Sequence, residues 1–404
     1  MPCTLSFLVI SVLSLLTWGF FALASAGNEN GIRLHNNPDY FIIRQLIWFG
    51  VSLPVAFLAA RFDYHNWKKY PKFTVAVYVL MLALLVAVFF FPEVNGSRRW
   101  VALGPVRLQA SEFAKLFLVI SLAVFIDRSG WKIAKFWRGA VPAALIAGTM
   151  MLPVMFEPDY GATLIMGVTA LLLYLISDMK FVYVALFCMM GGGVVAAKIC
   201  SNANRMNRIF SWLKGMFGQA VATGGAVVMS DKELAAAHQA DMALVAIRNG
   251  GLTGVGFNSS YQKLRYLPEA HTDFIFAIGA EEWGLIFSLS MVVLFSVFFV
   301  CGILISLRAK DRLGRLIAYG MTCLIFIQVV LNIGVVTKCL PTKGLALPFI
   351  SYGGTNLLAA LIAVGVLFNI GRQIELQKSR PRSTLSPAFS RAPGARDAQE
   401  QEGV

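Results

Sequence analysis

Apolar runs long enough to cross a lipid bilayer recur along this chain, separated by short polar segments. A membrane helix needs about 20 predominantly apolar residues, with a lower limit of about 17. Ten runs qualify, some close to that limit, at roughly 5–26, 41–60, 73–92, 110–126, 139–156, 161–177, 181–200, 274–306, 315–336 and 349–370. The pattern predicts an all-α integral membrane protein with about ten transmembrane helices. The eighth run is too long for one straight helix, so its first turns are expected to be re-entrant or interfacial.

Two segments do not fit the spanning pattern. Residues 201–273 predict a large extracytoplasmic loop between spans 7 and 8. Residues 372–404 are rich in Pro, Ser and Arg and predict a disordered cytoplasmic tail, which leaves 1–371 as a polytopic membrane domain. The first run ends in "ALASA", which resembles a signal-peptidase site. Because this run is long and no Lys or Arg precedes it, we favour an uncleaved first span over a cleaved signal peptide.

Composition and charge support the membrane assignment. The chain has 404 residues, of which 57% are hydrophobic and 14% charged; soluble domains carry about 25% charged residues. The net charge of +14 would suit a nucleic-acid-binding protein, but the positions of the charges argue against one. With the N-terminus inside, the inner segments carry 19 Lys and Arg and the short outer segments carry six. The positive-inside rule therefore predicts cytoplasmic termini, with cations near anionic membrane lipid.

Four polar motifs fall on the predicted outer side. They are "NGSRRWVALGPVRLQASEFAKL", "EPDYGATL", "LRYLPEAHTDFIF" and "LPTKGLALPFISYGG". Ionisable residues at membrane depth suggest a functional site. The candidate cations for an anionic lipid headgroup are Arg98, Arg99, Lys115, Lys263, Arg265 and Lys343. The carboxylate of Asp273, with His271 two residues before it, could act as a base beside them, which suits transfer chemistry on a lipid-linked substrate.

Each motif also has an ordinary structural explanation. Glu112 and Lys115 would fit a helix start with a snorkelling lysine. Asp159 would fit an N-cap in a short turn, and Asp273 could cap the helix that follows it. The segment 340–356 could be an ordinary outer loop. What favours function is that all four motifs converge on one face of the membrane.

These motifs, with "GGLTGVGFNSSYQKLRYLPEAHTDFIFA" and "EEWG", closely resemble the SEDS family (shape, elongation, division and sporulation), the FtsW/RodA/SpoVE group of bacterial peptidoglycan glycosyltransferases. The resemblance covers about residues 40–371. "PTKG" followed by "LPFISYGG", and "YFIIRQLIWF" leading into the second span, favour the division branch over the elongation branch. The sequence departs from the family's pattern at "RNGG", in the ending of "HTDFIFAIGAEEWG" and over residues 201–240.

The resemblance implies a SEDS fold of ten transmembrane helices in the bacterial inner membrane, acting at the division septum. The implied substrate is lipid II, a disaccharide-pentapeptide on undecaprenyl pyrophosphate, polymerised at the outer face. Asp273 carries over as the general base and the cations as diphosphate ligands. The other substrate-binding candidates are Glu112, Asp159, His271 and Ser351.

The resemblance also implies a class B penicillin-binding protein as transpeptidase partner, together with other divisome proteins. No cofactor or metal-ligand cluster is evident, although a divalent cation, Mg²⁺ or Mn²⁺, could help to bind the diphosphate. The alternatives are a lipid II flippase, an elongation polymerase of the RodA type and a structural scaffold. Neither a flippase nor a scaffold needs one indispensable carboxylate.

Overall fold

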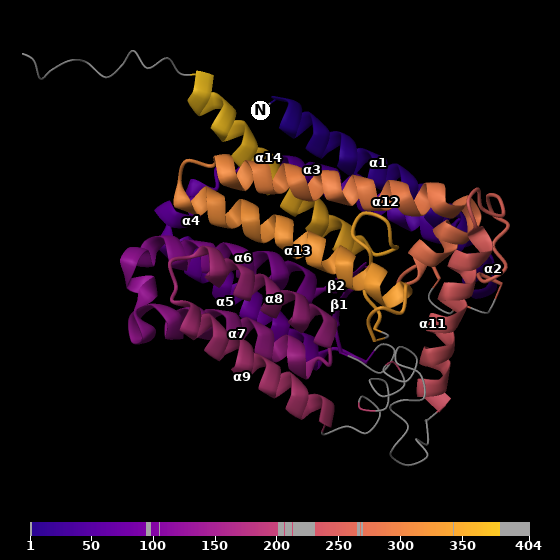
Figure 1. The fold of residues 1–404 in the computed structure, drawn as a ribbon, viewed down its shortest axis with the longest axis horizontal. Coiled ribbons are helices and arrows are strands. Elements are labelled where there is room, and N and C mark those ends of the chain that lie inside the picture. Colours follow the sequence, from indigo (N-terminus) through magenta and orange to yellow (C-terminus); the bar gives the residue numbers. More distant parts are fainter. Residues whose placement is uncertain are drawn as a thin grey trace, which may run out of the picture.

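The computed structural model describes residues 2–93, 98–104, 106–200, 206, 212, 231–264, 267, 270–341 and 343–379. These residues form a bundle of helices lying side by side (Figure 1). The long helices are α1 (Pro2–Ala26), α3 (Tyr40–Arg61), α5 (Pro71–Ala87), α6 (Ala110–Ser129), α7 (Val141–Phe156), α8 (Tyr160–Ile176), α9 (Phe181–Cys200), α11 (Asp231–Gly250), α12 (Ile275–Arg308), α13 (Arg312–Val336) and α14 (Gly354–Ser379). The short ones are α2 (Asn28–His35), α4 (His65–Lys69), η1 (Val88–Phe90), η2 (Gly130–Ala134) and η3 (Phe136–Ala140).

Every predicted apolar run contains one of these helices. Among the described residues, seven helices are long and apolar enough to cross a membrane, namely α1, α3, α5, α7, α12, α13 and α14, with short helical turns extending α5 and α7. Shorter apolar helices at Tyr160–Ile176 and Phe181–Ala197 occupy two further runs. The last run is α6, which carries ionisable side chains. The prediction of an all-α, multi-pass membrane protein is confirmed.

The long eighth run is divided, as its length predicted. Helix α12 breaks at Gly284, where φ is 64° and ψ is −147°. Glycine is favoured here because a side chain is strained at this φ. A Cβ would also lie 2.5 Å from the amide nitrogen of Gly254 and 2.7 Å from the carbonyl oxygen of Leu252. The segment after α11 therefore packs directly on the break, which separates residues 275–283 from the main part of the helix.

One predicted boundary needs correction, and the predicted loop contains a helix. Residues 231–250 of the expected loop form α11, whose buried Ala240, Ala243 and Ala246 allow it to pack closely on α12. Helix α14 continues to Ser379, so residues 372–379 are not a disordered tail. The remaining parts of these two predictions, 201–230 except for residues 206 and 212, and 380–404, lie outside the described residues.

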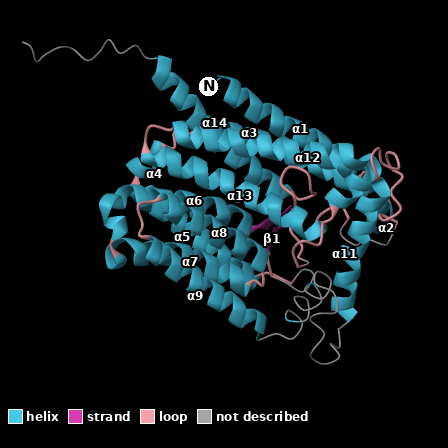
Figure 2. Cartoon of the chain, in the orientation of Figure 1, coloured by secondary structure: helices cyan, strands magenta, loops and turns pink. Residues whose placement is uncertain are grey.

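A small hairpin interrupts the helical pattern. Strands β1 (Trp100–Leu103) and β2 (Val106–Gln109) pair antiparallel directly before α6 (Figure 2). The amide nitrogen of Gln109 donates to the hydroxyl of Thr355, 3.3 Å away at the start of α14. The hairpin therefore lies where α6 and α14 begin. We call this end of the bundle the hairpin end.

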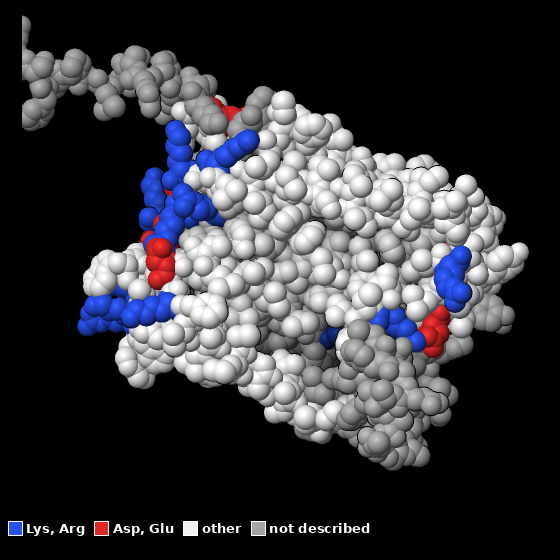
Figure 3. Space-filling view, viewed as in Figure 1, with Lys and Arg blue, Asp and Glu red and all other residues white. Residues whose placement is uncertain are grey.

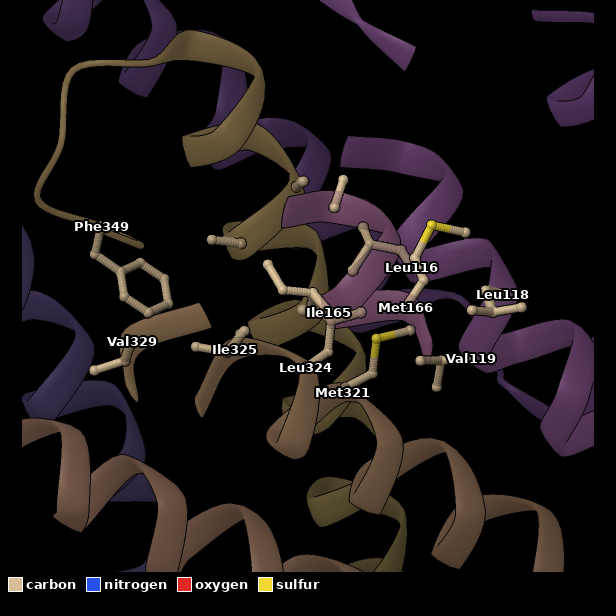
Figure 4. Close-up of a cluster of buried hydrophobic side chains, with 14 of the residues drawn as sticks. Leu116, Leu118, Val119, Ile165, Met166, Met321, Leu324, Ile325, Val329 and Phe349 are labelled. Carbon is tan, nitrogen blue, oxygen red and sulfur yellow. The ribbon is translucent and has the colours of Figure 1, made fainter. Parts of the chain in front are cut away.

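The core lies where α6, α8 and α13 meet (Figure 4). Leu118, Ile165 and Met321 are fully buried there. At Gly320 of α13, a Cβ would lie 2.5 Å from a methyl group of Val119, so the absence of a side chain lets the helices approach closely. Because protein surrounds α6 on most sides, charged side chains on this helix need partners inside the protein.

Lysine and arginine side chains gather at the opposite end of the bundle (Figure 3). This basic end comprises α4, the ends of α3 and α6, and the link between α12 and α13. Its exposed cations include Arg61, Lys68, Lys69, Arg128 and Arg308. The positive-inside rule assigns this end to the cytoplasm, and that orientation remains a prediction.

Candidate active site

The carboxylate residue Asp273 lies at the hairpin end, directly before α12. The helix has Phe274 as its N-cap and no side-chain capping hydrogen bond. Asp273 thus precedes the N-cap position of α12 by one residue. Its side chain is half-buried, as expected of a group that can meet a substrate.

Hydrogen bonds from two neighbouring segments fix the main chain around Asp273. Three consecutive carbonyl groups, those of residues 271–273, accept hydrogen bonds from α13 and from the segment before α14. The donors are the amide of Tyr352 to His271 (3.0 Å), the hydroxyl of Ser351 to Thr272 (2.5 Å) and the carboxamide of Asn332 to Asp273 (3.0 Å). Ser351, a predicted substrate ligand, is buried and serves this support.

Lys343 belongs to a segment that touches Asp273. A Cβ at the next residue, Gly344, would collide with Oδ2 of Asp273, so the chain passes directly beside the carboxylate. The lysine amine lies 5.1 Å from the centre of the Tyr160 ring, and its Cε would be 3.0 Å from a Cβ at Gly161. Lys343 is half-buried. The loop thus passes beside the carboxylate at Gly344 and places the Lys343 amine at the start of α8.

Asp159 links α8 to the hairpin. Its Oδ1 accepts a hydrogen bond from the amide of Ala162 (3.2 Å), so the predicted N-cap is present. Its Oδ2 accepts from the side chains of Gln109 (3.2 Å) and Ser111 (3.3 Å). Asp159 is 5% exposed, and its oxygens bind protein groups that hold α8 against α6.

Glu112 and Lys115 form a buried ion pair of 2.9 Å within α6. The amine also donates to Oε1 of Gln328 on α13, 3.0 Å away. Lys115 is 2% exposed and therefore does not snorkel to a membrane surface. The pair borders a small cavity of about 10 Å³ that Asn356 also lines, with room for about one water molecule. In this arrangement the pair connects α6 to α13 through Gln328.

Lys263 takes part in a different polar group. Its amine lies 3.1 Å from Oε1 of Glu282, 2.8 Å from the hydroxyl of Ser25 and 2.5 Å from Oδ1 of Asn258. The neighbouring Glu281 accepts hydrogen bonds from the main chain and side chains of residues 249–262. We call these residues, Ser25, Asn258, Ser260, Lys263, Glu281 and Glu282, the Glu282 cluster. It joins α1, the segment 251–264 and the first part of α12.

The two arginines of the hairpin bind main-chain carbonyls. Arg99 donates to the carbonyl groups of Glu157 (3.3 Å) and Pro158 (2.7 Å). Arg98 is exposed, lies 3.2 Å from Oε1 of Glu93 and donates to the carbonyl of Phe89. Arg99 therefore fixes the turn before α8, and Arg98 lies at the surface.

Glu157 is a buried acid in that turn. Its side chain is 0% exposed, and neither carboxyl oxygen has a hydrogen-bond partner among the described residues. Burial, reinforced by the nearby charge of Asp159 and opposed by Arg99, raises the pKa of Glu157 to about 8. The carboxyl is therefore mostly neutral at pH 7, a state that the sequence motif did not reveal.

His271 is part of the wall of the site. It is 8% exposed, and its ring centre lies 4.3 Å from that of Phe41 and 5.7 Å from that of Tyr352. Its Nδ1 is 3.3 Å from the side-chain nitrogen of Asn30. The imidazole thus packs toward α2 and α3. Among the described residues, no group of three or more His, Cys, Asp or Glu is placed to hold a metal ion.

The sequence interpretation missed Gln328 and Asn332. Both are buried carboxamides on α13, one helical turn apart. Their signal was available, because two amides four residues apart in an apolar span share one face of a helix. Their partners could not be inferred, because these lie on other elements.

The fold and these polar groups define a polytopic membrane protein with an acid and a lysine side chain at one end of the bundle. The chain belongs to the FtsW/RodA/SpoVE family, whose model, described as "Cell cycle protein", matches residues 6–376. A relative named "Probable peptidoglycan glycosyltransferase FtsW" from Coxiella burnetii is 36% identical over 92% of this chain and 96% of its own length. The "Stage V sporulation protein E" of Bacillus subtilis is 35% identical over 90% and 96%, respectively.

Solved structures show the same fold. A chain from a structure titled "Structural coordination of polymerization and crosslinking by a peptidoglycan synthase complex" has a TM-score of 0.70 at 24% identity, covering 91% of this chain and 97% of that one. The rod shape determining protein RodA of Thermus thermophilus has a TM-score of 0.63 at 24% identity, covering 91% and 96%.

Proposed function

We propose that this protein is a peptidoglycan glycosyltransferase that polymerises lipid II at the outer face of the cytoplasmic membrane, in septal wall synthesis. The observation that carries the proposal is the half-buried carboxylate of Asp273 beside the segment of Lys343, on a main chain whose carbonyl groups at residues 271–273 each accept a hydrogen bond. The relatives named as peptidoglycan glycosyltransferases support the reaction class.

In the proposed reaction, the Asp273 carboxylate takes the proton from the sugar 4-hydroxyl of the acceptor lipid II. The freed oxygen attacks the anomeric carbon of the growing strand, and the bond from that carbon to the diphosphate breaks. Undecaprenyl pyrophosphate leaves with the bonding electrons. The Lys343 amine would stabilise the negative charge that develops on the diphosphate.

Partner and location follow as parts of the same proposal. The solved complex contains a synthase that both polymerises and crosslinks, by its title, which supports a transpeptidase partner of the class B penicillin-binding type for this chain. The relatives named FtsW support the division role over an elongation role.

The decisive experiment compares purified wild type with Asp273→Asn, each with its transpeptidase partner. The substitution keeps the shape and removes the proton acceptor, so glycan product resolved on a gel should fall by about 10²–10⁴-fold. Asp63→Asn, a carboxylate exposed at the basic end, is the matched control and should polymerise normally. A flippase or scaffold predicts near wild-type synthesis from Asp273→Asn, and that outcome would refute the catalytic assignment.

The proposed orientation has a separate test. Cys339 is exposed in the link between α13 and α14, and Trp131 is 66% exposed at the end of α6. With Cys3, Cys188 and Cys200 replaced by Ser, a membrane-impermeant maleimide should label Cys339 in intact cells. In a chain that also lacks Cys339, Trp131→Cys should be labelled only after permeabilisation. The reverse pattern would invert the topology.

A further inference from the structure

Two carboxamides on α13 reach from an apolar helix into the loop that carries Lys343. Gln328 is 4% exposed and Asn332 is 1% exposed. The Nε2 of Gln328 donates to the carbonyl of Ala346 (2.9 Å), and the Nδ2 of Asn332 donates to the adjacent carbonyl of Leu345. Because residues four apart lie on one helix face, the two amides hold neighbouring positions of the same loop.

Asn332 differs from Gln328 in what else it holds. Its Nδ2 also donates to the carbonyl of Asp273, 3.0 Å away. A carboxamide nitrogen has two hydrogens, and here one serves the chain at Asp273 and the other the chain at Leu345. These two carbonyl groups, which would repel each other without a shared donor, are thus drawn to one nitrogen.

Gln328 connects the same loop to the ion pair of α6. Its Nε2 also donates to Oδ1 of Asn356 (3.1 Å), while its Oε1 accepts from Lys115. The loop is therefore attached at one position to the interior of the bundle and at the next to the chain at Asp273. The second attachment fixes the loop at Asp273 itself, while Ser351 and Tyr352 attach its later part to the carbonyl groups of the two preceding residues.

We propose that Asn332 is a positioning residue that sets the separation between the Asp273 carboxylate and the Lys343 amine. The two side chains lie on segments of different elements, and Asn332 bridges those segments at Asp273 itself and two residues after Lys343. A base and a diphosphate ligand act on the same substrate, so their spacing decides how often a bound substrate is in reactive geometry. The inference rests on the proposed function.

The test substitution is Asn332→Asp, which preserves shape and removes both N–H donors. The kcat of lipid II polymerisation should fall by about 10²-fold, because a displacement of about 1 Å has effects of that size. The KM should change little, since binding groups remain. The ratio of variant to wild-type rate should rise as the pH falls, because a protonated carboxyl at position 332 regains one donor.

Hydrogen–deuterium exchange gives a readout that does not depend on activity. Exchange in peptides covering 271–276 and 343–353 should increase in Asn332→Asp. The matched control is Asn369→Asp, because Asn369 is also buried and donates to the carbonyl of Ala60, 2.7 Å away at the basic end. This control should leave exchange in both peptides, and kcat, at wild-type values.

Several outcomes would overturn the positioning role. One is a wild-type kcat for Asn332→Asp; a second is a loss of kcat matched by the Asn369→Asp control; a third is a rise in KM alone. If Asn332→Asp does not fold, Asn332→Ser retains one donor and should give an intermediate kcat, and a wild-type kcat there would also overturn it. Failure of the proposed function looks different, since wild type would then make no glycan, or Asp273→Asn would remain active.

Discussion

Two groups of polar side chains flank the first part of α12, and they use the same residue types in opposite ways. Before the helix, Asp273 and Lys343 are both half-buried. Two turns into it, in the Glu282 cluster, Lys263 is 6% exposed and Glu282 is 1% exposed, and protein groups surround the lysine amine. An ion pair enclosed by protein donors supports the fold, whereas an acid that reaches the surface can meet a substrate.

The hydrogen bonds described around Glu281 and Glu282 end on different atoms from those described around Asp273. In the Glu282 cluster, side chains bind the carboxylates themselves, including Ser260 on Glu281 and Lys263 on Glu282. At Asp273, the three supporting hydrogen bonds go to main-chain carbonyls. The structure thus fixes the position of the Asp273 backbone through hydrogen bonds to the carbonyl groups of residues 271–273. Motif membership alone did not distinguish these two situations, and Lys263 had been grouped with the substrate ligands.

The largest effect that separates the two groups concerns stability. Lys263→Met should destabilise the protein by about 3–5 kcal/mol, because the buried charge of Glu282 loses its cation. The double variant Lys263→Met/Glu282→Gln should recover part of that loss. Chemical denaturation in detergent would measure both. A Lys263→Met variant with wild-type stability and a raised KM for lipid II would instead make Lys263 a substrate ligand.

Glu157 offers a pH-dependent comparison. Its folded pKa of about 8 exceeds the ordinary 4.5, so the native state retains a proton that the unfolded state has lost. The contribution of Glu157 to the free energy of unfolding is fully present below pH 4.5 and is lost as the pH rises through 8. Relative to Glu157→Gln, wild type should therefore lose stability between these values, by on the order of a few kcal/mol. Parallel denaturation profiles of the two proteins across that range would contradict the assignment.

Lys343→Met tests the half-buried pair of Asp273 and Lys343 directly. Removing one of several diphosphate donors should lower kcat/KM for lipid II by on the order of 10-fold. Stability should change little, because the amine is half-buried and lies beside the Tyr160 ring. Steady-state polymerisation rates and unfolding temperatures would separate the two effects. A loss of stability comparable to that of Lys263→Met would remove the contrast between the groups.

The smallest effect is expected at Arg98. Like Lys115 and Lys343, it was a candidate cation for an anionic lipid headgroup, but its guanidinium is exposed and paired with Glu93. Surface ion pairs of this kind contribute about 0–1 kcal/mol. Arg98→Gln should therefore change the free energy of unfolding by no more than about 1 kcal/mol. The rate of lipid II polymerisation should stay within about 2-fold of wild type. A large rise in KM for lipid II would return Arg98 to the substrate site.

The sequence by itself determined the membrane-spanning helices, because hydropathy is a local property and each span must satisfy the bilayer independently. It also singled out Asp273 as a candidate base, and the length of the eighth apolar run indicated the break in α12. It did not predict α11, since small residues such as Ala243 carry a weak hydropathy signal, or the extension of α14 past residue 371. There Gln373 donates to Asp63 across the basic end, 2.9 Å away.

Only the tertiary structure decided which polar groups became partners. Lys115 and Lys343 belong to similar motifs, yet the first is enclosed with Glu112 and Gln328 while the second reaches a half-exposed position. The support of Asp273 by Asn332 joins residues 59 positions apart. Local composition cannot specify such pairs, because a buried polar group takes its partner from whichever element the packing of helices brings within hydrogen-bonding distance.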